Sequence, residues 1–141
     1  MHTTCQNPLA LIGRILLAWM FIPAGVSKLT GFAGTVGYAA SAGMPLPEAG
    51  VAIGLVIELV GGILLLIGWH TRWAALALAI FTAVAAFIFH AYWSLPAEQA
   101  TVQQLMFTKN LAITGGLLAF AAFGAGGWSV DARRSPVAGV H

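Results

Sequence analysis

The stretch VAIGLVIELVGGILLLIG, residues 51–68, decides the fold. Its length and apolar composition suit a helix that crosses a bilayer, which takes roughly 20 residues. One carboxylate, Glu58, stands near its middle. An ionised side chain at that depth is costly unless it faces protein or water, so Glu58 marks a functional site by default. Gly54, Gly61 and Gly62 lie at about helical spacing from Glu58, which predicts a strip where another helix can approach closely.

The composition indicates that the whole chain is a membrane protein. Its 141 residues are 60% hydrophobic and only 7% charged, and the mean hydropathy is +0.90. Soluble domains have about a quarter of their residues charged, so we expect a single membrane domain over residues 1–141 with the lipid bilayer as its surroundings. The net charge of +2 comes from few residues and gives no argument for nucleic-acid binding.

The hydropathy pattern predicts an all-α membrane protein, a bundle of four transmembrane helices. The spans are expected at about residues 9–29, 50–69, 73–93 and 105–124. The first is expected to be retained rather than cleaved as a signal, because it contains Arg14 and no basic stretch precedes it.

The segments between the spans are expected to lie outside the hydrocarbon. Residues 32–40 predict a short interfacial helix between spans one and two. Residues 94–104 are interpreted as a polar loop. The tail, residues 125–141, is expected to be exposed and poorly ordered beyond Asp131.

The distribution of lysine and arginine predicts the topology. With four spans, both termini and the turn at residues 70–72 share one side of the membrane. That side has four arginines against two lysines on the other: Arg14, Arg72, Arg133 and Arg134 against Lys28 and Lys109. Cationic residues are enriched on the cytoplasmic side, so both termini are predicted to be cytoplasmic.

Polar groups from all four spans fall at one depth. A helix rises about 1.5 Å per residue, which places one such group or pair from each span in the outer leaflet. These groups are Lys28, Glu58, His90, Lys109 and Asn110. Nothing in membrane insertion requires this coincidence, so we predict a small polar pocket there.

Each of these residues also has a purely structural interpretation. Lys28 could be a snorkelling anchor, and Glu58 could pair with Lys28 or Arg14 only to join helices. His90 could be a core histidine whose hydrogen bonds are satisfied, and Lys109 and Asn110 could simply cap and anchor the fourth helix. Arg14, towards the other face, is expected as a structural ion-pair partner of Glu58 or an inner-rim anchor. A buried salt-bridge network without chemistry therefore stays open.

Several chemistries are excluded by the residues available. The expected spans contain one histidine, His90, whereas haem held between spans usually takes two histidines as ligands. Cys5 is the only cysteine, so neither a disulfide nor an iron–sulfur cluster is expected. Nucleotide loops, nucleophile elbows and paired metal-ligand motifs are absent, and no metal is expected.

The remaining chemistry favours a lipid-soluble carrier such as a quinone. A hydrogen-bonding cluster walled by aromatic side chains, Trp93 among them, would suit its headgroup. Glu58 would act as proton acceptor or charge partner, and His90 and Lys109 as donors to the headgroup. Asn110 would be an orienting donor, and Lys28 an electrostatic gate.

Four ordered motifs carry a family resemblance. They are GVSKL at residues 25–29, ELVGG at 58–62, FHAYW at 89–93 and FTKNL at 107–111. With Arg14 in span one, the chain resembles the DoxX family of small four-span membrane proteins over roughly residues 9–125. The resemblance implies a bacterial inner-membrane protein associated with redox systems, such as subunits of quinol oxidases or thiosulfate:quinone oxidoreductases.

Two alternatives to a quinone-binding role stay open. The chain could be a non-catalytic accessory subunit of a membrane redox complex, with its glycine strips as contacts to a partner or to a second copy. It could also be a small permease or proton path. A path predicts polar groups at successive depths, whereas the inner half offers only Arg14.

Overall fold

The computed structural model describes residues 2–135, and all regular structure within this range is helical. The elements are α1 (His2–Thr30), α2 (Phe32–Ser41), α3 (Pro47–Ile67), α4 (Thr71–Phe89), the short 3₁₀ helix η1 (Tyr92–Ser94), α5 (Ala97–Phe123) and α6 (Val130–Arg134). Four segments are long and apolar enough to cross a membrane: most of α1, α3, α4 with η1, and α5. The predicted all-α fold with four membrane-spanning helices is confirmed.

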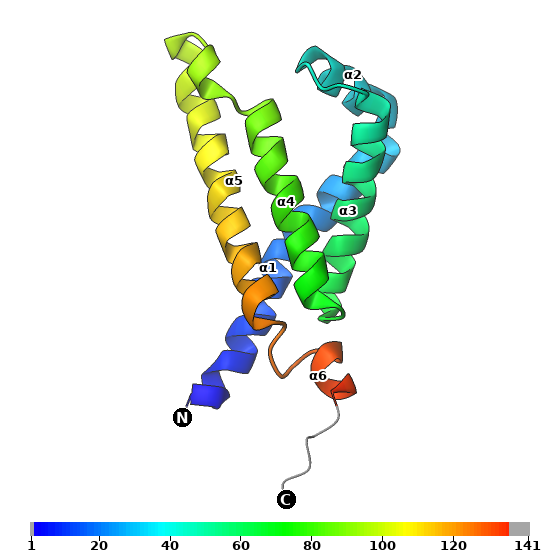
Figure 1. Cartoon of the computed structure of the whole chain (residues 1–141), viewed down its shortest axis with the longest axis vertical. Helices are drawn as coiled ribbons and strands as arrows, with labels where there is room; N and C mark the ends of the chain where they lie inside the picture. Colours follow the sequence, from blue (N-terminus) through cyan, green and yellow to red (C-terminus); the bar gives the residue numbers. More distant parts are fainter. Residues whose placement is uncertain (1, 136–141) are drawn as a thin grey trace, which may run out of the picture.

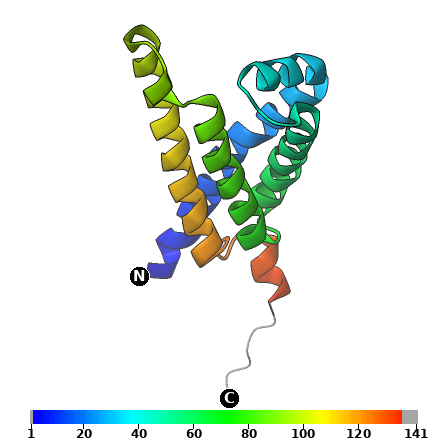
Figure 2. The same cartoon turned by 45° about the horizontal axis from the view of Figure 1, so that its top comes forward.

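The long helices pack mainly in neighbouring pairs (Figure 1). α1 lies against α3, while α4 lies between α3 and α5. Figure 2 shows α2 folded over the end of α3, at the opposite end of the bundle from the start of α1 and from α6. The interfacial position of α2 and the cytoplasmic location of the termini remain predictions.

The glycine strip of α3 lets its neighbours approach closely. A Cβ added at Gly62 would lie 2.9 Å from Cγ1 of Ile22 on α1. A Cβ added at Gly61 would lie 3.0 Å from Cγ of Leu78 on α4. The strip therefore faces two helices at once, and the core forms around it. The main cluster of buried apolar residues consists of Phe21, Leu65, Ala75, Leu78, Ala79 and Leu117.

The last long helix begins earlier than expected. Residues 94–104 were predicted to be a loop, but α5 already starts at Ala97, after Pro96. Glu98 in the first turn complements the positive end of the helix dipole, and the following alanine and glutamines are good helix formers. Local propensity therefore outweighs the polarity of this segment, and Gln103 lies on α5.

The C-terminal segment is more ordered than the sequence suggested. Residues 130–134 form α6, and the backbone N–H of Asp131 donates to the Gly68 carbonyl at 2.8 Å. The Asp131 carboxylate accepts hydrogen bonds from the backbone N–H groups of His70, at 2.8 Å, and Thr71, at 3.0 Å. These bonds satisfy donors at the start of α4, whose own N-cap residue makes no side-chain bond. The expectation for residues 136–141 lies outside the described residues.

The contact of Asp131 with the start of α4 predicts that the docking of the C-terminal segment depends on pH. Burial alone would raise the pKa of Asp131, but the hydrogen bonds from Thr71 and His70 outweigh it and hold the pKa below its usual range. A depressed pKa in the folded state means that the contribution to stability is present above the unfolded-state value of about 4. The contribution is lost as the pH falls through the lower, folded-state value.

We therefore expect residues 124–135 to lose hydrogen-exchange protection selectively when the pH falls below about 4. Exchange measured by mass spectrometry over a pH series, corrected for intrinsic exchange rates, reports this loss. The Asp131→Asn variant should show no acid step in this segment. An equal acid step in both proteins would rule out Asp131 as its cause.

Candidate functional site

A cavity of about 330 Å³ lies between the four long helices, near the end at which α1 finishes. We call it the polar pocket. Its polar lining comes from four long helices and α2: Lys28, Thr35, Tyr38, Glu58, Thr82, His90 and Asn110. Four of these seven residues were singled out in the sequence.

Glu58 is held inside the bundle by an ion pair. Lys28 Nζ in the last turn of α1 lies 2.7 Å from Glu58 Oε2 on α3, and the two side chains are 25% and 7% exposed. Gly25, one turn before Lys28, brings the helices together here, since a Cβ on it would lie 3.0 Å from the backbone nitrogen of Leu59. The close contact thus places the ammonium group beside the carboxylate.

His90 occupies the C-terminal end of α4 and contacts α5. Its Nδ1 lies 2.7 Å from Oε1 of Gln103. A carboxamide oxygen can only accept a hydrogen bond, so Nδ1 donates this bond, and the tautomer that this contact selects has Nε2 as its acceptor nitrogen. The imidazole is therefore oriented by its neighbour and presents an acceptor.

Aromatic side chains form the apolar walls of the polar pocket. Phe21, Phe81, Phe89 and Tyr38 line it. Tyr38 of α2 stacks on Phe89 of α4, with ring centroids 5.5 Å apart and an interplanar angle of 13°. Apolar walls with a few convergent polar groups are typical of small-molecule sites.

Two residues expected in the pocket lie elsewhere. Lys109 is exposed, and its ammonium contacts Met106 Sδ at 3.4 Å. Successive helix residues are rotated by about 100°, so with Asn110 lining the polar pocket, Lys109 is turned away. Trp93 packs against Phe87 and Phe107, with centroids 6.0 and 5.5 Å away. It joins the end of α4 to α5 and does not line the pocket.

Arg14 does not form the expected ion pair with Glu58. It is buried, at 1% exposure, and donates to the carbonyls of Leu65 (3.4 Å), Leu66 (2.9 Å) and Trp128. Leu65 lies about 10 Å further along α3 than Glu58. Arg14 instead joins α1 to the end of α3 and to the segment before α6.

Comparison with known proteins gives the family. The DoxX family model matches residues 9–91, which is more than half of the chain. The chain belongs to the DoxX family. The matched region contains Lys28, Glu58 and His90, whereas Asn110 lies beyond it.

This DoxX-family chain is similar to two inner membrane proteins of Escherichia coli strain K12. It is 43% identical to YqjF over 123 residues, covering 86% of this chain and 88% of that protein. It is 38% identical to YphA over 125 residues, covering 89% of each. A weaker match, 27% over 126 residues, covers 37% of a Surfeit locus protein 4 homolog of Schizosaccharomyces pombe. No solved structure gives a significant match. The protein is thus an integral inner-membrane member of the family.

Sequence reasoning missed four polar residues of this DoxX-family site. Thr35, Tyr38 and Thr82 line the polar pocket, and Gln103 orients His90. Gln103 precedes Asn110 by seven residues, which places both on one face of a helix, but the loop prediction for residues 94–104 concealed this. Over residues 2–135, no three His, Cys, Asp or Glu side chains gather where they could hold a metal ion.

Proposed function

We propose that this DoxX-family protein binds the headgroup of a quinone-type molecule in the polar pocket and serves a membrane redox system. The observation that supports it is the meeting of an ammonium, a carboxylate, an imidazole and a carboxamide from four helices in one aromatic-walled cavity. A quinone ring offers two apolar faces and two oxygens, so it needs both kinds of surface.

Each polar group has a distinct part in this proposal. The Asn110 amide and the Tyr38 hydroxyl donate to quinone oxygens, while His90 Nε2 accepts from the hydroxyl of the reduced quinol. Glu58, compensated by Lys28, is the second proton acceptor. Oxidation of a quinol releases two protons and two electrons; the protons pass to these acceptors, and the electrons pass to a partner oxidoreductase in the membrane.

Equilibrium binding of decylubiquinone to purified, lipid-depleted protein tests the proposal. We expect the wild type to bind and His90→Ala to bind about tenfold more weakly, the equivalent of one lost hydrogen bond. Lys109→Met is the matched control and should bind like the wild type, because Lys109 does not line the polar pocket. Absent binding in the wild type, or equal binding by wild type and His90→Ala, would contradict the proposal.

A second candidate function is that of an accessory subunit in a redox complex. Within α5 only Leu117 is buried, and a Cβ added at Gly115 or Gly116 would meet nothing within 4 Å. Small residues on a membrane helix permit close approach of another helix. This role requires stoichiometric co-purification with a partner and loss of that partner when the chain is deleted.

A further inference from the structure

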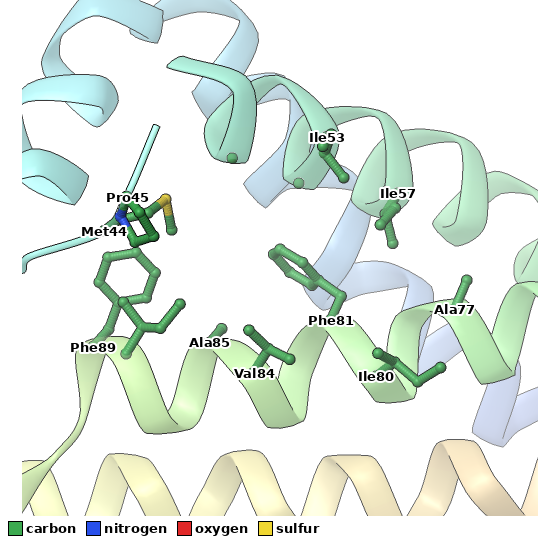
Figure 3. Close-up of a pocket in the computed structure, with 13 residues that line it drawn as sticks. Met44, Pro45, Ile53, Ile57, Ala77, Ile80, Phe81, Val84, Ala85 and Phe89 are labelled. Atoms are coloured by element: carbon green, nitrogen blue, oxygen red, sulfur yellow. The ribbon is translucent and has the colours of Figure 1, made fainter. Parts of the chain in front are cut away.

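A second, larger cavity lies between α3 and α4 (Figure 3). Its volume is about 530 Å³, and every residue that lines it is apolar. We call it the apolar groove. Ile53 and Ile57 of α3 point towards α4, and Ala77 of α4 points towards α3, while Met44 and Pro45 close one end. A groove without a polar group suits a hydrocarbon chain and no headgroup.

The apolar groove and the polar pocket adjoin. Phe81, Ala85 and Phe89 of α4 line both cavities, so the two spaces lie on either side of the same three side chains. On α3 the boundary falls between adjacent residues, because Ile57 lines the groove and Glu58 lines the polar pocket. A molecule with its polar end beside Glu58 therefore has an apolar compartment next to it.

Phe81 forms part of the wall between the cavities. Figure 3 shows its side chain directed from α4 towards α3. A Cβ added at Gly54 would lie 2.9 Å from Phe81 Cε2, so the ring occupies space that only a glycine leaves free.

The apolar groove lies on the lipid-facing side of the bundle. Ile53, Ile80 and Val84 are 60%, 59% and 51% exposed, whereas Glu58 in the adjoining pocket is 5% exposed. The groove is thus directly open to a ligand dissolved in the bilayer.

From this arrangement we infer that the ligand is a lipid-soluble molecule with a compact polar headgroup and a single long apolar tail. The headgroup lies in the polar pocket, and the first part of the tail lies in the apolar groove. The molecule passes from the bilayer between α3 and α4, past Phe81. This inference rests on the proposed function, and it adds the tail and the route.

The test compares two probes that share one headgroup: a tailless dimethoxy-methyl-benzoquinone and decylubiquinone. In wild-type protein decylubiquinone should bind more tightly than the tailless probe, and we call the ratio of the two dissociation constants the tail preference. The groove-filling variants Val84→Trp and Ala77→Phe should reduce this tail preference about tenfold. Binding of the tailless probe should not change, because neither residue lines the polar pocket. That unchanged binding also shows that the variants are folded. All proteins are measured in one detergent, so partition of the tail into micelles cancels.

The matched control is Val60→Trp, which places the same side chain on a half-exposed position of α3 outside both cavities. It should keep the wild-type tail preference. Unchanged preference in both groove variants, with the tailless probe still bound, would overturn the tail site and leave the proposed function standing. If neither probe binds the wild type, the proposed function itself fails. Displacement of the tailless probe by vesicles of a two-chain phospholipid would overturn the single-tail assignment.

Discussion

The Lys28→Met variant is expected to lose about 3 kcal/mol of unfolding free energy, because it leaves a buried carboxylate without its counter-ion. Glu58 is 7% exposed at its side chain, and Lys28 Nζ lies 2.7 Å away. Arg14 does not replace Lys28 as the counter-ion, because it is engaged with backbone carbonyls further along α3. Reversible unfolding in mixed micelles of increasing dodecyl sulfate fraction measures the loss.

The double variant Lys28→Met/Glu58→Gln should recover most of that loss, since it removes the charge that Lys28 compensates. Lys109→Met is the control for removing a lysine near the same depth. Its side chain is exposed and unpaired with any carboxylate in residues 2–135, so we expect a change within about 0.5 kcal/mol. Equal losses for Lys28→Met and Lys109→Met would show that the ion pair does not stabilise the bundle.

The Arg14→Met variant is expected to lose roughly 2–4 kcal/mol of unfolding free energy, because the carbonyls of Leu66 and Trp128 lose the donor that the buried Arg14 guanidinium supplies. The loss should be accompanied by release of residues 124–135, which Arg14 joins to α3. Unfolding in mixed micelles gives the stability, and hydrogen exchange gives the protection of the segment.

Arg14→Lys is the conservative comparison. It keeps the positive charge, but a single ammonium lacks the planar fork of donors that reaches carbonyls on two segments, so we expect an intermediate loss. Full protection of residues 124–135 in Arg14→Met would refute the role of Arg14 in docking this segment.

Depth along the membrane was predictable from the sequence, because helical rise converts residue number directly into height. Lys28, Glu58, His90 and Asn110 were expected at one height, and the structure places them around one cavity. The close approach at Gly62 followed equally from spacing, since a small residue between long apolar ones permits contact.

Rotation about the helix axis was the harder quantity. Lys109 and Asn110 are neighbours, yet only Asn110 lines the polar pocket. Which of the two faces the pocket depends on the rotation of α5 about its axis, and the polarity of residues 94–104, which favours a loop, conceals the start of that helix. The acceptors of Arg14 could not be predicted either. They are backbone carbonyls, which every residue has, so the sequence does not indicate which of them Arg14 contacts.

The apolar groove could not be predicted for a different reason. Lipid-facing side chains are as apolar as those that line a cavity, so hydropathy does not distinguish Val84 beside the groove from Val60 outside it. Only the positions of α3 and α4 reveal that Phe81 and Phe89 belong to both cavities.

The most direct measurement of the central claim is photolabelling with an azido-benzoquinone, followed by peptide mass spectrometry. We expect labels on residues around the polar pocket, such as Tyr38, Phe89 and Asn110, and we expect excess decylubiquinone to suppress them. Labels spread over lipid-facing positions such as Trp19 and Phe123, which are 79% and 86% exposed, and insensitive to competitor would contradict the account.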